Sequence, residues 1–436
     1  MNKLLIGTTT VSMLMLSSWA TANTTIELQR FFGACEAEYG KATDVSAAVG
    51  ECGIITTLVN KFDADNPDID VKVTTVEWPG YDQLNAQLAS RSAPDVVSMH
   101  YSAMSDYQSR GLLVPLDALL KDQKIKATDF TDAAISSVTK EGKIYALPFD
   151  NWTMLFHVNN NLMEKAGLMK ADGNPILPTS RDELFTQGKQ FYDATGKPYL
   201  VQILANETAT YARIFYTLMM QQDSPFFADP SRIDLSGKDA KAALSFMKDI
   251  MDKGLSTTDM DYPAAVSGFA NGDGGIAVNG TWLIGSYYDQ STKADNALSN
   301  GYSVFPVPQF FKQKDATYAD GHGWVVPRGN RSDEKMAAIG KLFKFLYDND
   351  FEWSRTGHLP TVKKVIASNE FKSLPHRSDI AKIAKTGQAL PAGVLRQFAI
   401  QDILGEELGS AVNGDKSIDD ALETAQYRIN DLLENI

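Results

Sequence analysis

Three short motifs in the sequence match the signature of penicillin-binding serine enzymes. Ser137 to Lys140 reads S-x-x-K, Tyr347 to Asn349 reads Y-x-N, and Lys385 to Gly387 reads K-T-G, in the chain order of that class. The chemistry requires the serine at the start of a helix and the K-T-G inside a neighbouring strand. The residues before the K-T-G follow helical spacing, and a second S-x-x-K occurs at Ser245 to Lys248. A serine hydrolase is therefore only an alternative.

Carboxylates are the second candidate for catalysis, because two of them at the right separation hydrolyse a glycosidic bond. The chain has 54 acidic residues, and most are expected on solvated helical faces. Sequence spacing cannot identify a catalytic pair among them. An exported glycoside hydrolase is a further alternative, but we expect no enzyme, and no catalytic residue is assigned.

Cysteine and histidine side chains were considered as metal ligands. Cys35 and Cys52 lie close together in the sequence, and an oxidising compartment favours a disulfide between them. The histidines show no H-x-x-x-H spacing and lie far from the cysteines, so we expect no metal site and no cofactor. They are His100, His157, His322, His358 and His376.

The first 22 residues have the organisation of a secretory signal peptide. Lys3 gives a basic start, Leu4 to Leu16 is mostly apolar or small, and Ala20-Thr21-Ala22 is a small-x-small cleavage site. We expect cleavage after Ala22 and export to the periplasm. No cysteine follows that site to carry a lipid, so the mature protein is expected to be soluble.

Length and charge narrow the function classes further. A chain of 436 residues is too long for one compact core and suits two lobes. The net charge of −13 opposes binding to nucleic acid or to an anionic membrane.

Strand and helix patterns alternate along the mature chain, which predicts an α/β fold with a mostly parallel sheet in each lobe. No flexible Gly/Ser linker separates the lobes, so the chain is expected to cross between them more than once. Strands are expected at 25–32, 69–73, 94–99, 143–148 and 154–158, and helices at 54–62, 81–88, 104–110, 181–192, 209–220, 240–251 and after Ser417.

Seven segments in order make the chain resemble the extracellular solute-binding proteins of ABC importers, specifically the sugar-binding group. No one segment is diagnostic, but their order is specific, and the resemblance covers essentially the whole mature chain. The segments are Pro94-Asp95-Val96-Val97 through Gly111 to Asp117; Tyr145 to Asp150; Phe156 to Asn159; Gly268 to Trp282; Tyr302 to Pro308; Gly323 to Pro327; and Gly357 to Thr361.

The resemblance implies two α/β lobes with a ligand held between them, a membrane permease as partner, and a monomer. It places residues 23–150 and 303–357 in the N-terminal lobe and residues 151–302 and 358–436 in the C-terminal lobe. Crossings are implied near Asp150 to Trp152, Tyr302 to Val304 and Gly357 to Thr361. The chain departs from maltose-binding proteins in its longer, cysteine-bearing first loop and in Met99-His100-Tyr101 after the Pro94-Asp95 strand.

A sugar site stacks aromatic rings on the sugar faces and surrounds the hydroxyls with polar groups. Trp282 follows the turn at Asn279-Gly280 after an apolar strand, where ligands of α/β folds gather. Trp152 lies at the first crossing beside Asp150 and Asn151. We expect these residues to hold a small neutral ligand, a carbohydrate. The further candidates are Gly280, Trp324, His322, Trp78, Tyr81, His100, Tyr101, Arg355 and His358.

A polyol or glycerophosphodiester receptor of the same fold is the alternative binding function. That ligand would require positively charged side chains in the cleft that donate hydrogen bonds to its phosphate. Among such residues, only Arg355 is well placed, beside the implied crossing at Gly357 to Thr361. A bidentate contact by Arg355 and a surface ion pair are equally compatible with the sequence.

Overall fold

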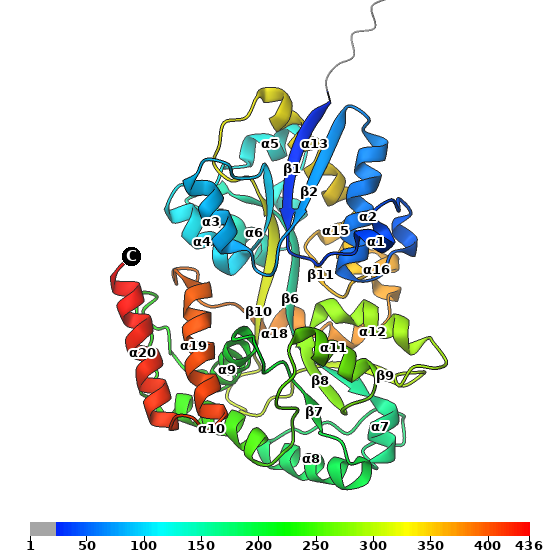
Figure 1. Cartoon of the computed structure of the whole chain (residues 1–436), viewed down its shortest axis with the longest axis vertical. Coiled ribbons are helices and arrows are strands. Elements are labelled where there is room, and N and C mark those ends of the chain that lie inside the picture. The colour runs from blue at the N-terminus through cyan, green and yellow to red at the C-terminus, as the bar shows by residue number, and fades with distance from the viewer. Residues whose placement is uncertain (1–22) are drawn as a thin grey trace, which may run out of the picture.

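The computed structural model describes residues 23–436, so the expected signal peptide and its cleavage site lie outside the described residues. The described part forms two lobes stacked along the long axis (Figure 1). None of its helices is long and apolar enough to cross a membrane.

One sheet runs through both lobes, with strand order β2-β1-β3-β10-β6-β8-β7. The sheet is mixed, whereas the sequence predicted mostly parallel strands: β1 is parallel to β2 and β3, but β10 is antiparallel to β3 and β6, and β6 is antiparallel to β8 and β9. The strands of the path are β1 (Thr24–Arg30), β2 (Ile69–Thr75), β3 (Val96–His100), β6 (Ala146–Asn159), β7 (Leu200–Val201), β8 (Ile276–Gly280) and β10 (Thr317–Val325). Shorter strands are β4 (Thr139–Lys140), β5 (Lys143–Ile144), β9 (Tyr302–Pro306), β11 (Leu359–Pro360) and β12 (Gly387–Gln388).

Strand β6 is one continuous strand of 14 residues, where the sequence predicted two. Every residue of it except Asn151 is buried, as is typical of a strand covered on both faces. Its first part pairs with β10 in the N-terminal lobe, and its last part pairs with β8 and β9 in the C-terminal lobe. The prediction of two strands failed because these partners come from distant parts of the chain.

The N-terminal lobe packs helices on both sides of β1–β3 around a core that includes Phe62, Phe130 and Trp324. Its helices are α1 (Glu36–Tyr39), α2 (Gly50–Asp65), α3 (Tyr81–Ala89), α4 (Tyr101–Ser109), α5 (Asp117–Asp122), α6 (Asp132–Val138), α13 (Asp333–Asp348), α14 (Asp350–Ser354), α15 (Lys363–Ala367) and α16 (Asn369–Ser373). The expected disulfide is confirmed: Cys35 and Cys52 are joined, with their Cα atoms 6.0 Å apart, and link the segment before α1 to α2.

The C-terminal lobe packs its helices around β7–β9. Ser417 accepts a hydrogen bond from the Asp420 amide, as expected for the start of the terminal helix. The helices are α7 (Asn160–Lys165), α8 (Arg181–Thr195), α9 (Ala209–Gln221), α10 (Lys238–Asp252), α11 (Tyr262–Ala270), α12 (Ile284–Ser291), α17 (Arg377–Ile380), α18 (Ile383–Thr386), α19 (Gln397–Val412) and α20 (Ile418–Glu434).

The connections between the lobes differ in part from those implied by the resemblance. The segment expected to cross near Tyr302 is β9, which pairs with Leu155–Asn159 of β6 inside the C-terminal lobe, and the chain crosses later, along β10. Residues after β11 first return to the N-terminal lobe, where Val362 and Val365 join its core. The chain then enters the C-terminal lobe through α17, whose Ile380 packs in a core of that lobe.

Candidate functional site

Strands β10, β6 and β11 lie side by side at the junction of the lobes. On one edge of β6, His322 of β10 is paired with Asp150, and Asp320 with Trp152. On the other edge, Leu359 and Pro360 of β11 pair with Asn151 and Asp150. The pairing of these strands therefore brings together residues that are far apart in the sequence.

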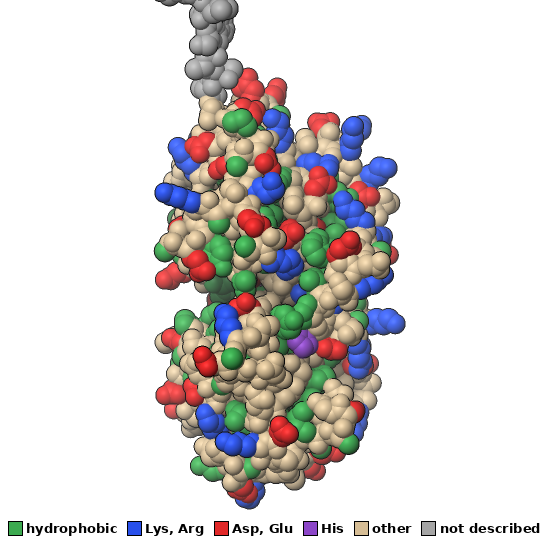
Figure 2. All heavy atoms as spheres, turned by 90° about the vertical axis from the view of Figure 1, so that its right-hand side faces the viewer, with side chains coloured by type: hydrophobic (Ala, Val, Ile, Leu, Met, Phe, Trp, Pro, Cys, Tyr) green, Lys and Arg blue, Asp and Glu red, His purple; other side chains and the backbone are tan. Residues whose placement is uncertain are grey.

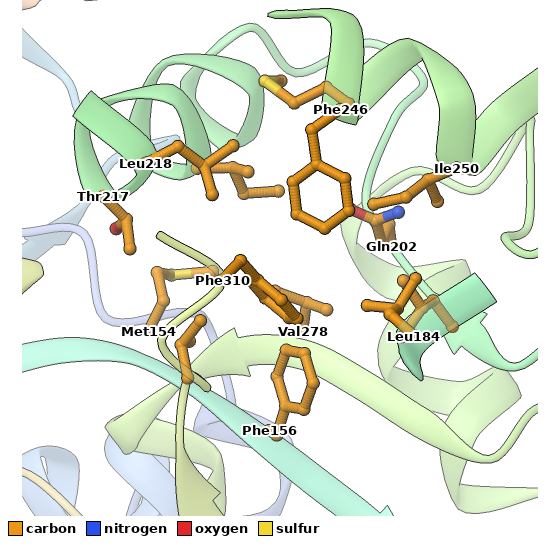
Figure 3. A pocket seen from close by; sticks show the side chains of 14 residues that line it. Met154, Phe156, Leu184, Gln202, Thr217, Leu218, Phe246, Ile250, Val278 and Phe310 are labelled. Atoms are coloured by element: carbon orange, nitrogen blue, oxygen red, sulfur yellow. The ribbon is translucent and has the colours of Figure 1, made fainter. Parts of the chain in front are cut away.

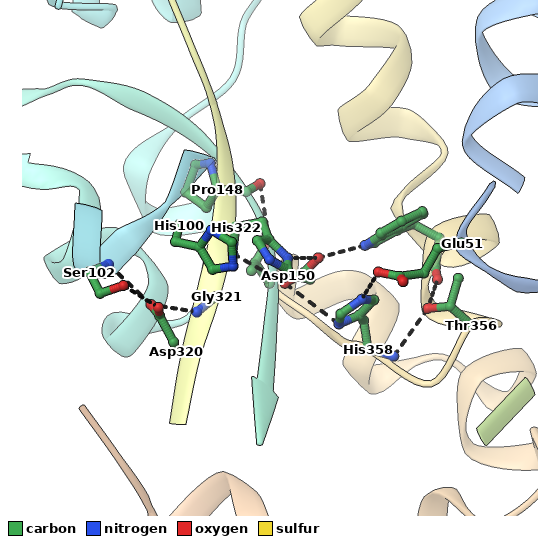
Figure 4. Close-up of polar contacts among 12 residues, drawn as sticks. Glu51, His100, Ser102, Pro148, Asp150, Asp320, Gly321, His322, Thr356 and His358 are labelled. Carbon is green, nitrogen blue, oxygen red and sulfur yellow. Dashed lines mark hydrogen bonds and ion pairs between the residues drawn. The ribbon is translucent and has the colours of Figure 1, made fainter. Parts of the chain in front are cut away.

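Asp150 is fully buried and is the centre of a hydrogen-bond network (Figure 4). His322 Nδ1 lies 2.9 and 3.0 Å from its two carboxylate oxygens, and Trp353 Nε1 donates to Oδ2 at 2.7 Å. Burial alone would raise the pKa of Asp150, but the neighbouring His322 and His358 outweigh it and hold the pKa below its usual value. The carboxyl group is therefore ionised at neutral pH.

His358 extends this network towards α2. Its Nε2 lies 2.9 Å from Glu51 Oε1, its Nδ1 lies 3.7 Å from Asp150 Oδ1, and its ring stacks on Trp353 with centroids 5.2 Å apart. Burial alone would lower the pKa of His358, but Asp150 and Glu51 outweigh it and raise the pKa. His358 thus lies between two carboxylates, those of Glu51 and Asp150.

Asp150, His322 and His358 each bring one ligand atom within 4.8 Å of the others, so they could hold a metal ion. No metal site is expected from the sequence, because these residues have no ligand spacing along the chain. Their existing contacts account for the arrangement without a metal, since the carboxylate already faces His322 Nδ1 and Trp353 Nε1.

The N-terminal lobe contributes a second set of rings around His100. Trp78 Nε1 donates to His100 Nε2 at 3.3 Å, so Nδ1 carries the proton and donates to Tyr81 Oη at 2.7 Å. Burial, aided by the charge of His322, lowers the pKa of His100 well below its usual value, which agrees with a neutral ring. Phe398 of α19 packs against this set from the C-terminal lobe, 5.0 Å from the His100 ring.

Trp152 and Trp282 form the aromatic wall contributed by β6 and the C-terminal lobe. Their rings meet edge to face with centroids 5.4 Å apart. Trp282 Nε1 donates to Tyr262 Oη at 2.9 Å, which fixes the indole. A Cβ atom at Gly280 would lie 2.0 Å from the Trp282 ring, so glycine is needed there for the indole to fold back over the backbone.

Asp320 faces the same junction from β10. It accepts hydrogen bonds from Ser102 Oγ at 2.5 Å, from the Ser102 amide at 3.2 Å and from the Gly321 amide at 2.8 Å. Burial raises the pKa of Asp320, although these donors oppose the shift. The contacts tie β10 to the start of α4.

Most of the residues predicted from the sequence thus meet around Trp152, but Trp324 does not. Trp324 is fully buried in the core of the N-terminal lobe, with its ring centroid 5.3 Å from Phe149 and 6.2 Å from Phe32. Strand alternation puts His322 and Trp324 on the same face of β10. They differ because Trp324 lies two residues further into the N-terminal lobe.

Arg355 is also placed away from the rings. It donates to the main-chain carbonyls of Val45, Ser46 and Ala48 at 2.7–2.9 Å and pairs with Glu352 at 2.8 Å. These contacts hold the loop before α2 and engage both terminal nitrogens of Arg355 away from the rings.

Tyr101 and Asn151 lie beside the junction. A Cβ atom at Gly321 would lie 2.3 Å from the Tyr101 ring, so this ring packs directly on the β10 backbone. The Tyr101 hydroxyl is buried without a hydrogen-bond partner among the described residues. Asn151 is the one residue of β6 that is not buried.

Four residues that the sequence analysis did not single out join the site. Arg213 lies over the Trp152 ring at 4.7 Å, and Glu51, Tyr262 and Phe398 make the contacts given above. Arg213 had a visible signal, because it is the only charged residue in the otherwise apolar helix segment 209–220. The other three had none, since their importance depends on tertiary contacts with His358, Trp282 and His100.

The serine-enzyme motifs are not assembled into a catalytic site. Ser137 lies near the end of α6 and donates its hydroxyl to the Ala133 carbonyl at 2.9 Å. Lys385 and Thr386 end the short helix α18. The chemistry requires the serine at a helix start and the K-T-G in a strand, and neither condition is met.

Two cavities lie outside the group of site residues at the junction of the lobes. One, of about 40 Å³, is inside the C-terminal lobe between β6, α9 and α10 and is almost entirely apolar (Figure 3). The other, of about 250 Å³, lies between the start of α2 and α12 and is lined by Arg355 and Arg377. The surface on that side narrows between the lobes (Figure 2).

Comparisons with known proteins agree with this architecture. Residues 53–352 match the family model described as bacterial extracellular solute-binding protein. An arabinooligosaccharide-binding protein of Bacillus subtilis is 24% identical over 326 residues, covering 72% of this chain and 72% of the relative. An sn-glycerol-3-phosphate-binding periplasmic protein of Escherichia coli is 23% identical, covering 96% of this chain and 95% of the relative.

A solved structure shows the same fold. The GacH receptor of Streptomyces glaucescens, determined unliganded and with acarbose and an acarbose homolog, superposes with a TM-score of 0.77 at 20% identity. The match covers 94% of this chain and 99% of that chain.

Proposed function

This chain belongs to the bacterial extracellular solute-binding protein family, and we propose that it captures a carbohydrate between its lobes for the membrane permease of an ABC importer. The observation that carries the proposal is the meeting of indole rings and polar side chains from both lobes around Trp152. Trp282 comes from the C-terminal lobe and packs against Trp152. Trp78 comes from the N-terminal lobe and packs against His100. A sugar could stack on these rings. A relative named as an arabinooligosaccharide-binding protein and a similar structure solved with acarbose support the choice of ligand class.

Capture follows from lobe closure in this proposal. A ligand that touches both lobes favours the closed form only by the contacts that closure adds. The lobes would turn about β6 near Asp150, about β10 near His322 and about the segment between α16 and α17. A permease would then recognise the outer surface of the closed form.

Export as a soluble monomer is part of the same proposal. The sequence of the first 22 residues supports a signal peptide that is cleaved after Ala22, with release to the periplasm. The disulfide between Cys35 and Cys52 is consistent with an oxidising compartment.

The alternative of a glycerophosphodiester receptor depended on Arg355 as phosphate donor. Arg355 is instead used by three main-chain carbonyls, so this alternative loses the residue on which the sequence analysis based it.

A thermal-shift panel of oligosaccharides, polyols and glycerophosphodiesters tests the proposal. A ligand at 100 times its Kd stabilises the folded protein by about 2.7 kcal/mol. We expect at least one saccharide to raise the Tm without being consumed. Hydrolysis of a saccharide, or a panel in which no saccharide raises the Tm, would contradict the proposal.

A further inference from the structure

Arg213 is a buried cation at the junction of the lobes. It projects from α9, where its neighbours along the helix are mostly apolar, and only 6% of its surface is exposed. Its guanidinium carbon lies 4.7 Å from the centroid of Trp152 and 5.1 Å from that of Trp78. Trp78 belongs to the N-terminal lobe, so the guanidinium lies between the two lobes.

Among residues 23–436, no side chain or main-chain carbonyl accepts a hydrogen bond from the Arg213 guanidinium, and no carboxylate forms an ion pair with it. Its Nε atom is buried without a partner. Arg30 and Arg377, two other buried arginines of the described chain, also have an Nε atom without a partner. Their terminal nitrogens, however, donate to main-chain carbonyls, those of Gly33 and Ser354, whereas the terminal nitrogens of Arg213 have no such acceptor.

The acidic groups around the junction are engaged elsewhere. Asp150 faces His322, Asp320 accepts from Ser102, and Glu51 faces His358. Burial raises the pKa of Glu207, and the charge of Arg213 opposes that shift, but the two side chains form no ion pair. The positive charge of Arg213 thus faces only the indole rings of Trp78 and Trp152 among the described residues.

A second donor beside Arg213 also has no acceptor. The Trp152 indole nitrogen is buried and unpartnered among the described residues. A buried N–H group without a hydrogen bond costs free energy. The unpartnered N–H groups of Arg213 and Trp152 therefore predict that a bound molecule supplies the oxygen atoms that accept from them.

A guanidinium favours anionic groups. Its fork of N–H donors matches two oxygen atoms of a carboxylate or phosphate in two parallel, charge-assisted hydrogen bonds, and sugar hydroxyls offer oxygen atoms without the negative charge. A neutral sugar would also leave the buried charge uncompensated. Cation–π contact with two indoles compensates only part of that cost.

We propose that the ligand is a saccharide bearing an acidic group, a carboxylate or a phosphate, which Arg213 binds between Trp78 and Trp152. This inference rests on the proposed function and replaces the neutral ligand expected from the sequence. The carboxylate of a uronic acid and the phosphate of a sugar phosphate present the same oxygen arrangement to the guanidinium.

Matched ligand pairs test the proposal by titration calorimetry. Oligogalacturonate, oligomannuronate and oligoguluronate are compared with their methyl esters, and sugar phosphates with their parent sugars. We expect one acidic member to bind at least about 100-fold more tightly than its neutral counterpart, and its affinity to fall as salt rises. The two series distinguish a carboxylate from a phosphate.

Variants assign that preference to Arg213. Arg213→Gln should reduce the difference between acidic and neutral members below about tenfold, and Arg213→Lys should leave an intermediate difference. Arg181→Gln is the matched control, because Arg181 also lies over an aromatic ring, Phe246, but pairs with Asp249 away from the junction. The control should keep the full preference. The Tm of each unliganded variant shows that it is folded.

The outcomes separate this inference from the proposed function. Equal or tighter binding of a neutral saccharide would overturn the acidic ligand and leave the receptor function standing, as would a full preference retained in both folded Arg213 variants. If no saccharide of either kind binds, both proposals are overturned.

Discussion

The imidazole of His322 faces both carboxylate oxygens of Asp150, at 2.9 and 3.0 Å, and this contact joins β10 to β6 where the chain crosses between the lobes. Both residues are buried, so the contact is poorly screened by solvent. Trp353 and His358 complete the surroundings of the carboxylate. The stability of the folded protein should therefore depend on this buried network, which lies where β6 and β10 pass between the lobes.

Asp150→Asn should therefore be strongly destabilising. Removing one partner of a buried charged contact costs about 3–5 kcal/mol, because the other partners remain desolvated. The measurement is the free energy of unfolding in urea at neutral pH. Asp132→Asn is the control, because Asp132 pairs with Lys363 at the exposed surface and should have a far smaller effect. Equal effects of the two substitutions would contradict the role of the network.

The sequence predicted the local elements well because their signals are local. The strand at β2, the helix at α2 and the capped start of α20 follow from alternation, helical period and Ser417. Strand β6 was predicted in two pieces because its continuity depends on β10, β8 and β9, which follow far later in the chain.

The candidate site was predictable only as a set of residue types near strand ends. His322 and Trp324 are separated by one residue, yet one lies at the junction and the other in a core. Arg213 stood out by its charge in an apolar helix, but its position between two indoles depends on tertiary packing. Pairings between lobes leave no spacing that a sequence pattern can reveal.

His157 should make stability depend on pH. Burial lowers its pKa to about 3, while the ring contacts Tyr302 Oη at 2.8 Å and the Gly280 carbonyl at 3.0 Å. Because the folded pKa lies below the unfolded value of about 6.5, this contribution is present above pH 6.5 and is lost as pH falls towards 3.

The test compares the wild type with His157→Gln in urea between pH 6.5 and 4.5. The wild type should lose up to about 1.4 kcal/mol per pH unit more than the variant. His100 and His358 also titrate, but they are present in both proteins and cancel in the difference. Parallel curves for the two proteins would contradict the assignment.

Removing the disulfide should destabilise the folded protein. Cys35 and Cys52 are separated by 17 residues, and closing a loop of that size stabilises by about 3 kcal/mol. The Cys35→Ser, Cys52→Ser double variant should lose about this amount in urea unfolding. Reductant should weaken the wild type similarly and leave the variant unchanged; a response of the variant to reductant would contradict the explanation.

Trp282 and Trp324 should respond in opposite ways to truncation. Trp282→Ala should abolish the ligand-induced change in tryptophan fluorescence and change the Tm of the empty protein by only a few degrees. Trp324→Ala removes a core indole and should cost about 3–5 kcal/mol of stability. A large loss of stability in Trp282→Ala, with the fluorescence response kept, would make Trp282 a packing residue.

Phe398 should act on lobe closure. It extends from α19 of the C-terminal lobe to rings of the N-terminal lobe, with centroids 4.8 Å from Tyr81, 5.0 Å from His100 and 5.8 Å from Trp78. These contacts cannot survive separation of the lobes, so they stabilise the closed form alone. Each aromatic contact contributes about 0.5–1.5 kcal/mol beyond area burial.

Phe398→Ala should therefore weaken binding of the saccharide identified in the panel by about tenfold or more, because a smaller fraction of molecules is closed. Small-angle scattering should show that saturating ligand still compacts the variant to the wild-type radius of gyration. Phe185→Ala is the control, because Phe185 packs within the C-terminal lobe, and its affinity should match the wild type. An unchanged Kd in Phe398→Ala would show that closure does not depend on this ring.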